Sequence, residues 1–236
     1  MGLDEASQKP HDRLAAWLAT DMDAVNALIR TRMASEHAPR IPEVTAHLVE
    51  AGGKRLRPML VLLFSRALGF EGPERFEMAA TVEFIHTATL LHDDVVDESS
   101  LRRGQQTANA LFGNAASVLV GDFLYTRAFQ MMVAPGDLRI LEILAEATNV
   151  IAEGEVHQLM NMHDASLDEQ AYLRVIRAKT AKLFEASSRL AAILAGADAQ
   201  TEAHCADYGQ ALGAAFQIID DVLDYEGDAA ELGKNL

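Results

Sequence analysis

The stretch Leu90-Leu-His-Asp-Asp-Val-Val-Asp-Glu-Ser-Ser-Leu-Arg-Arg-Gly104 places a cluster of carboxylates directly before a pair of arginines. In a helix, with about 100° between successive residues, Asp93 and Asp97 stand one turn apart on one face and Asp94 lies beside them. Carboxylate oxygens bind hard divalent ions, and Mg²⁺ is typically held by one or two carboxylates together with substrate phosphates. The stretch therefore predicts a Mg²⁺ site that a phosphorylated substrate completes.

The same aspartate spacing recurs near the end of the chain, at Asp220, Asp221 and Asp224. A single acidic run of this kind is more often a solvated helix face. Both copies, however, stand among apolar residues at core spacing: Leu90, Leu91, Val95 and Val96 around the first, and Phe216, Ile218, Ile219, Val222 and Leu223 around the second. Because buried carboxylates need cations or hydrogen bonds, we expect the two clusters to face each other across a metal-filled cavity.

Composition sets the broad class of the protein. The chain has 236 residues, 50% of them hydrophobic, a formal net charge of -15 and one cysteine. It can bury a substantial core and is most simply one domain, residues 1–236. The negative charge argues against a nucleic-acid partner, since phosphate backbones are held by basic surfaces. The single Cys205 rules out an internal disulfide, fits a reducing cytoplasm and is expected to be a small core residue.

The chain carries no sign of membrane insertion. The N-terminal residues 1–6 include neither a basic leader nor a long apolar run, so no signal peptide is expected. No segment reaches the roughly 18 consecutive apolar residues of a membrane span. We expect a soluble, cytoplasmic protein.

Apolar residues at three- and four-residue intervals predict helices along the whole chain. From this spacing and from capping residues, helices are expected over residues 12–34, from residue 42 to Gly52 and Gly53, over 59–68, and from Pro73 into the first aspartate cluster. Five more are expected: a helix capped by Thr107, a helix capped by Asn114 that ends near Pro135, a helix over 137–162, a helix opened by a Ser166–Glu169 capping box, and a helix over 199–225. No strand or hairpin signal is convincing. The expected fold class is all-α, a helical bundle with short connections.

A basic turn opened by glycines, Gly52-Gly53-Lys54-Arg55-Leu56-Arg57-Pro58, stands at the expected start of a helix. Free amide groups and the helix dipole favour anions at such a position. The residues alone leave two interpretations equally open, a solvated loop and an anion site. His86 lies two turns before Asp93 on the same helical face, where a histidine is more often structural.

Together these motifs resemble the trans-isoprenyl diphosphate synthases, also called polyprenyl synthetases. The resemblance covers nearly the whole chain and rests on residues 52–58, His86, the first aspartate cluster with Arg102 and Arg103, Lys179 with Thr180, and Gln217 with the second aspartate cluster. It is nearest to the long-chain octaprenyl and decaprenyl diphosphate synthases. One departure is that the chain stops at Gly233-Lys234-Asn235-Leu236, whereas family members continue with further helices. The expected single domain therefore lacks its C-terminal helices or has a remainder that the sequence does not represent.

The resemblance implies a fold, a reaction and partners. The fold is a bundle of mostly antiparallel helices around a deep central cavity, of the isoprenoid synthase type, usually as a homodimer. The reaction is a Mg²⁺-dependent, head-to-tail condensation of an allylic prenyl diphosphate with isopentenyl diphosphate, with three ions present once the diphosphate is bound. The product is a long-chain all-trans polyprenyl diphosphate for a quinone side chain, and peripheral delivery of that product to a membrane stays open.

The resemblance also assigns roles to residues of this chain. The metal ligands are Asp93, Asp97, Asp220 and Asp224, and the catalytic set adds Asp94, Asp221, Arg102 and Lys179. Isopentenyl diphosphate is assigned Lys54, Arg57, His86 and Arg103. The allylic diphosphate is assigned Arg102, Lys179, Thr180 and Gln217, and Lys234 matches a further substrate-binding position. Arg55 is expected to be a supporting surface charge, and His92 a structural neighbour of the aspartates.

Chain length is expected to depend on Ala88 and Thr89, which stand five and four positions before Asp93. Short-chain members of the family tend to place an aromatic floor here, whereas two small residues leave room for a growing tail. The alternative is that Ala88 is small to let helices pack closely.

Other functions are compatible with parts of these motifs. A farnesyl or geranylgeranyl synthase would use the same site, and a class I terpene cyclase would also ionise an allylic diphosphate but would have no use for Lys54, Arg57, His86 and Arg103. A non-catalytic partner subunit is disfavoured by the intact aspartates at both sites. A purely structural helical protein would not bind a diphosphate with Mg²⁺.

Overall fold

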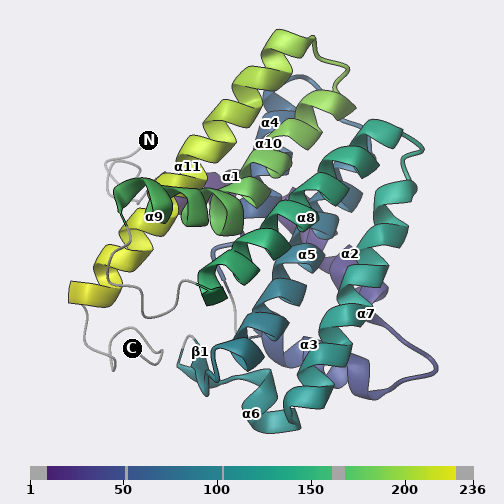
Figure 1. Cartoon of the computed structure of the whole chain (residues 1–236). Coiled ribbons are helices and arrows are strands. Elements are labelled where there is room, and N and C mark those ends of the chain that lie inside the picture. Colours follow the sequence, from purple (N-terminus) through teal and green to yellow (C-terminus); the bar gives the residue numbers. More distant parts are fainter. Residues whose placement is uncertain (1–9, 51–52, 103, 161–167, 227–236) are drawn as a thin grey trace, which may run out of the picture.

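The computed structural model describes residues 10–50, 53–102, 104–160 and 168–226, and these are almost entirely helical (Figure 1). The helices are α1 (Pro10–Trp17), α2 (Ala19–Met33), α3 (Arg40–Glu50), α4 (Leu56–Ala67), α5 (Glu74–Val96), α6 (Ala108–Phe112), α7 (Asn114–Val133), α8 (Leu138–Met160), α9 (Glu169–Ile176), a π-helix (Arg177–Ala181), α10 (Lys182–Leu194) and α11 (Ala199–Glu226). The prediction of an all-α bundle is confirmed.

The long helix α5 lies in the middle of the bundle and packs against α2, α4, α7 and α10 (Figure 1). Its run from Met78 to Ile85 is buried on every side, because neighbouring helices cover the whole circumference. The side chains become acidic toward its C-terminal end, where Asp93 and Asp94 lie. The helix therefore carries the first aspartate cluster from the core to the edge of the bundle.

A short hairpin follows α5, and the expectation of no strand was wrong. Strand β1 (Leu101–Arg102) pairs antiparallel with β2 (Gln105–Gln106), with Arg102 opposite Gln105. Gly104 has φ of 76°, a left-handed conformation that glycine adopts without steric cost. Strands of two residues are too short to produce a visible alternation of apolar and polar residues.

Two predicted helices need correction. The predicted helix 12–34 is divided at Leu18, although hydrogen bonds from Leu18 N to Leu14 O and from Met22 N to Leu18 O continue across the division. Asn114 is the first residue of α7, and Gly113, with φ of 87°, takes the cap position instead.

The start of α9 also differs from the prediction. Its cap is Asp168, whose carboxylate accepts a hydrogen bond from Ala171 N at 2.7 Å. An aspartate cap satisfies a free amide of the first turn as well as a serine does. Several residues used in the predictions lie outside the described part of the chain: Gly52, Met162 and Ser166.

The apolar residues beside the second aspartate cluster are not core residues, contrary to expectation. α11 buries Glu202, Cys205, Gly209 and Gly213, which recur on one side of the helix. Ile219 is 58% exposed and Leu223 is 47% exposed on other sides. Helical spacing identifies which residues share a face, but it does not say which face a neighbour covers.

None of the helices in the described residues combines the length and apolar character needed to cross a membrane.

Candidate active site

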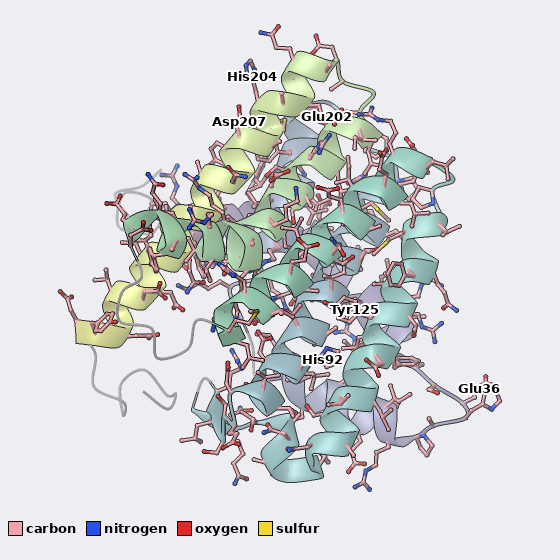
Figure 2. All side chains as sticks on the ribbon, viewed as in Figure 1. Glu36, His92, Tyr125, Glu202, His204 and Asp207 are labelled. Carbon is pink, nitrogen blue, oxygen red and sulfur yellow. The ribbon has the colours of Figure 1, made fainter. Side chains whose placement is uncertain are left out.

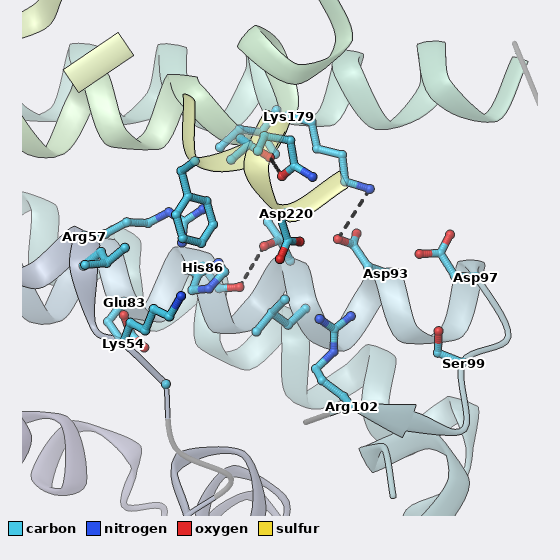
Figure 3. A pocket seen from close by; sticks show the side chains of 18 of the residues that line it. Lys54, Arg57, Glu83, His86, Asp93, Asp97, Ser99, Arg102, Lys179 and Asp220 are labelled. Atoms are coloured by element: carbon cyan, nitrogen blue, oxygen red, sulfur yellow. Dashed lines mark hydrogen bonds and ion pairs between the residues drawn. The ribbon is translucent and has the colours of Figure 1, made fainter. Parts of the chain in front are cut away.

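A cavity of about 770 Å³ opens between the start of α4, the second half of α5, the hairpin, α8, the π-helix and α11. Figure 3 shows basic and acidic side chains from these elements pointing into it. Most predicted site residues line its wall, although they are spread widely along the sequence: Lys54, Arg57, His86, Thr89, Asp93, Asp97, Arg102, Lys179, Thr180, Gln217 and Asp220.

The acidic wall combines α5 with α11. Asp93 and Asp97 come from the end of α5, and Asp220 comes from α11, so the two predicted clusters do contribute to one cavity (Figure 3). Burial raises the pKa of Asp93 to about 7; nearby Lys179 lowers it, whereas Glu155 and Asp97 raise it. Lys179 Nζ lies 3.8 Å from Asp93 Oδ2. The positive charges of Lys179 and Arg102 thus do not offset the burial of this carboxylate.

Glu155 on α8 is a cavity residue that the sequence reasoning missed. Its Oε2 accepts a hydrogen bond from Lys179 Nζ at 2.8 Å, while its buried Oε1 accepts none from the described residues. Burial alone would lower the pKa of Lys179, but Asp93 and Glu155 outweigh it, and the pKa lies above its ordinary value. Glu155 therefore helps to keep Lys179 charged and in place. Its only sequence signal is an acidic residue one turn beyond the buried Ile151.

Lys179 and Thr180 are presented by the π-helix, an irregularity that occurs frequently at functional sites. Glycines on both sides allow neighbouring backbones to approach it. A Cβ atom on Gly154 of α8 would lie 2.9 Å from Ala178 Cβ, and one on Gly213 of α11 would lie 2.6 Å from Ala181 Cα. Close packing thus fixes where the two predicted substrate-binding residues stand.

Across the π-helix, a short hydrogen-bonded chain reaches the second aspartate cluster. Thr180 Oγ1 donates to Gln217 Oε1 at 2.8 Å, and Gln217 Nε2 donates to Asp221 Oδ1 at 2.7 Å. Asp221 also accepts a hydrogen bond from the hydroxyl of Tyr172. Asp221 is therefore engaged beside the cavity and does not line it, in contrast to its predicted catalytic placement.

Asp94 and Asp224 are also placed differently from the prediction. Asp94 is fully buried, and its Oδ1 accepts hydrogen bonds from Arg102 Nε at 2.9 Å and Nη2 at 2.7 Å. This ion pair joins the end of α5 to the hairpin. Asp224 lies beyond Asp220 on α11 and is not part of the described cavity wall. Arg102 remains on the wall, so its predicted contact with a diphosphate is compatible with the pairing.

The two chain-length residues separate in the structure. Thr89 lines the cavity and donates a hydrogen bond to His86 O at 2.7 Å. Ala88 is fully buried in the hydrophobic core and does not line the cavity. The close-packing alternative therefore fits Ala88. Arg103 and Lys234 lie outside the described residues.

Arg55 is not the surface charge that was expected. Its side chain is 17% exposed and pairs with Glu83 of α5, and both residues line the cavity. Lys54 and Arg57 lie on aromatic rings instead. Lys54 Nζ is 5.7 Å from the ring centroid of Phe216, and Arg57 Cζ is 4.5 Å from that of Phe184.

His92 packs away from the cavity, against α7 (Figure 2). A Cβ atom on Gly121 would lie 2.3 Å from its Nε2, and its ring stacks on Tyr125 with centroids 5.8 Å apart. Burial, followed by the charges of Asp93 and Glu155, raises the pKa of Tyr125 to about 12. Because Gly121 has no side chain, His92 of α5 can pack closely against α7, behind the acidic wall.

The donor set fits Mg²⁺. Within the described residues, no group of three acidic, histidine or cysteine side chains is close enough to hold an ion by itself. Carboxylates nevertheless come from both sides of one cavity, and the buried Oε1 of Glu155 stands beside them. Mg²⁺ commonly takes few protein ligands and completes its octahedron with substrate phosphates and water. This wall is suited to an ion that arrives with a diphosphate.

The fold and this cavity define a class of helical enzyme that uses carboxylates and basic side chains together on a diphosphate ester. The polyprenyl synthetase family model matches residues 38–236. Octaprenyl diphosphate synthase of Escherichia coli (strain K12) is 57% identical over 218 residues, covering 92% of this chain and 67% of that protein. All-trans-nonaprenyl-diphosphate synthase (geranyl-diphosphate specific) of Rhodobacter capsulatus is 46% identical over 224 residues, covering 94% and 68%.

Solved structures agree. A decaprenyl diphosphate synthase from Rhodobacter capsulatus superimposes with a TM-score of 0.91 at 63% identity, covering 96% of this chain and 70% of that one. A polyprenyl synthase from Caulobacter crescentus CB15, complexed with calcium and isoprenyl diphosphate, gives 0.92 at 51% identity, covering 97% and 70%. The chain belongs to the polyprenyl synthetase family, and it is a trans-prenyltransferase. It spans about two thirds of the length of the curated relatives, 67% of the first.

Proposed function

We propose that this chain condenses an allylic prenyl diphosphate with isopentenyl diphosphate, head to tail, to make a long-chain all-trans polyprenyl diphosphate. The observation that carries the proposal is the single cavity in which basic residues stand on both sides of the acidic wall. Similarity to octaprenyl, nonaprenyl and decaprenyl diphosphate synthases supports a long product.

The two substrates use different parts of the cavity. Lys54, Arg57 and His86 bind the diphosphate of isopentenyl diphosphate, and they lie together at one end in Figure 3. The allylic diphosphate takes the other end and is bound by Arg102, Lys179, Thr180 and Gln217. Contacts from Arg103 and Lys234 stay predictions.

Asp93, Asp97 and Asp220 would hold Mg²⁺ together with the allylic diphosphate. The ions supply Lewis-acid stabilisation of the negative charge that develops when the allylic carbon–oxygen bond breaks. Lys179 and Arg102 stabilise the same charge through hydrogen bonds from fixed positions. The double bond of isopentenyl diphosphate then forms the new carbon–carbon bond, and a proton leaves with the departing diphosphate as its acceptor. Leu90, Ile151 and Phe216 on the wall help to exclude water from the allylic cation.

Product analysis tests the function. The purified protein, an allylic primer, labelled isopentenyl diphosphate and Mg²⁺ should give a series of extended prenyl diphosphates by mass spectrometry. Asp93→Asn and Asp220→Asn should lower turnover by about a hundredfold or more, because each removes charge stabilisation from the cavity. Asp207→Asn, at an exposed carboxylate on α11 away from the cavity, is the control. Wild-type turnover in either cavity variant at limiting Mg²⁺ would refute the metal assignment, and a product formed without isopentenyl diphosphate would indicate a cyclase.

Chain length is assigned to Thr89, which lies on the cavity wall. Thr89→Phe should shorten the product while the first condensations continue, since an aromatic ring would occupy the path of the tail. Ala88→Phe should instead lower the free energy of unfolding, by about 1–3 kcal/mol, because it overpacks the core. An unchanged product distribution from a well-folded, active Thr89→Phe variant would remove this assignment.

We further propose a homodimer. One side of α7 carries large exposed apolar residues at helical spacing, namely Val118, Leu119, Phe129 and Val133, with Leu119 66% exposed. An apolar stripe of this kind suits a self-complementary interface about a two-fold axis. Sedimentation should show a dimer that Leu119→Glu weakens. Use of the product in quinone synthesis and a place in the cytoplasm stay predictions.

A further inference from the structure

Arg55 has an unusual backbone conformation for an arginine. It stands at the cap position of α4 with φ of 49° and ψ of 33°, in the left-handed region. Among the described residues, the other non-glycine residue with positive φ is Glu98. Such a conformation costs a residue with a side chain free energy, so it persists where the surrounding structure imposes it. Its occurrence in the cavity wall calls for a specific cause.

The side chain of Arg55 is held in an ion pair within the protein. Arg55 Nη1 donates to Glu83 Oε1, and the side chains are 17% and 10% exposed. Glu83 lies in the middle of α5, one turn before His86, on a helix packed on all sides. Because both charges are largely removed from water, losing either one would leave the other buried without compensation. The pair therefore ties the basic turn to a helix that is buried in the middle of the bundle.

The side chain of Arg55 diverges from those of its basic neighbours. Lys54 and Arg57 reach the rings of Phe216 and Phe184 on α11 and α10, whereas Arg55 reaches α5. A further hydrogen-bond contact joins His11 Nε2 to Lys54 O at 3.3 Å. Arg55 thus connects the turn to α5, while Lys54 and Arg57 lie on the cavity wall.

We propose that Arg55 and Glu83 form a buried clasp, the pair Arg55–Glu83, that positions Lys54 and Arg57 for the diphosphate of isopentenyl diphosphate. The inference rests on the proposed function. Although both line the cavity, Arg55 and Glu83 act here as positioning residues, because their charged groups are engaged with each other. Without this ion pair the backbone at Arg55 leaves its left-handed conformation. Lys54 and Arg57 are then no longer positioned to bind the same diphosphate.

Steady-state kinetics with Glu83→Gln and Arg55→Gln test the clasp. Each variant should raise KM for isopentenyl diphosphate by about tenfold to a hundredfold, because small displacements of positioned groups have effects of this size. KM for the allylic substrate and the Mg²⁺ requirement should stay within about twofold, since those ligands are held at the other end of the cavity. The double variant should be no worse than the single variants, because each residue acts through the other.

Glu77→Gln is the matched control. Glu77 is on the same helix, pairs with Arg32 at 2.9 Å, has a side chain 15% exposed and does not line the cavity. It should lose stability without a change in either KM. Should Glu83→Gln fail to fold, Arg55→Lys keeps the charge but not the guanidinium geometry and should still show the selective rise in KM.

The outcomes separate the clasp from the proposed function. A wild-type protein that makes no prenyl product would refute the function itself. The clasp alone would be refuted if the wild type were active and the Arg55 or Glu83 variants raised both KM values equally. It would also be refuted if these variants, like Glu77→Gln, lost stability without a change in either KM. A selective defect for isopentenyl diphosphate supports it.

Discussion

Asp93 occupies a position where its own environment opposes its charge. Burial raises its pKa to about 7, Lys179 lowers it, and Glu155 and Asp97 raise it. An aspartate in water has a pKa near 4, so it would be ionised throughout the physiological range. In this cavity, without an added cation, the carboxyl exchanges its proton near neutral pH.

This pKa predicts how turnover responds to pH and Mg²⁺ together. The ionised carboxylate is the form that binds a metal, so a proton competes with the ion below about pH 7. The Mg²⁺ concentration for half-maximal turnover should therefore rise as pH falls through about 7, by up to about tenfold per pH unit. Lys179→Gln should move this dependence to higher pH, because it removes a charge that lowers the pKa of Asp93. A Mg²⁺ requirement that stays constant through neutral pH would contradict the prediction.

That both aspartate clusters contribute to one cavity was predictable, but which aspartates of each cluster line it was not, since Asp94, Asp221 and the predicted ligand Asp224 are off the wall. Adjacent residues on a helix point about 100° apart, so Asp93 and Asp94 cannot share one environment. Asp94 turns to Arg102, and Asp221 turns to Tyr172. Those partners come from the hairpin and α9, whose approach is not encoded in the aspartate motifs. The same is true of Arg55, whose sequence neighbours are cavity residues but whose own partner is on α5.

At the scale of elements, Gly154 sets the distance between α8 and the π-helix. A Cβ atom there would lie 2.9 Å from Ala178 Cβ and 3.2 Å from Lys179 N. Gly154→Ala should push Lys179 away from its position, raise KM for the allylic substrate and lower the free energy of unfolding by about 1–3 kcal/mol. Ala152→Gly on an exposed side of α8 should cost about 1 kcal/mol of stability through helix propensity.

Comparing Gly154→Ala with Ala152→Gly shows whether Gly154 positions Lys179 or matters only for stability. Thermal unfolding measures their stability, and titration of each substrate measures both KM values. If Gly154→Ala and Ala152→Gly were equally destabilised and neither changed the allylic KM, the glycine would matter for packing alone.

The long helices were predictable because their apolar period persists over several turns. Features of a few residues were not. The two-residue strands, the π-helix at residues 177–181 and the division at Leu18 leave no periodic trace, because they are set by contacts with other elements. The cap of α9 shows the same limit, since Asp168 and the predicted Ser166 are both good capping residues and the sequence does not rank them.

Across the whole molecule, one buried glutamate joins α8, α10 and α11 at a place away from the cavity, to whose wall α8 and α11 contribute. Glu202 of α11, labelled in Figure 2, is a buried residue. It pairs with Arg189 of α10 at 2.7 Å and with Arg139 of α8. Burial would raise the pKa of Glu202, but hydrogen bonds from Arg189 and then Arg139 hold it below its usual value. Asp220 lies 18 residues farther along α11, or about 27 Å at the usual helical rise. The predicted metal ligand Asp220 therefore lies far along α11 from the ion pairs of Glu202.

Cys205 lies on the buried face of α11, one turn after Glu202, and it is the single cysteine of the sequence. Burial, followed by the charge of Glu202, raises the pKa of its thiol, so little reactive thiolate is present at neutral pH. A thiol reagent such as Ellman's reagent should modify the native protein far more slowly than the denatured one. A diphosphate added with Mg²⁺ should slow modification further by holding α11 through Asp220. Equal rates with and without the diphosphate would refute that coupling. The rate at which Cys205 is modified thus reports how often the bundle opens around α11, without any label or inserted probe.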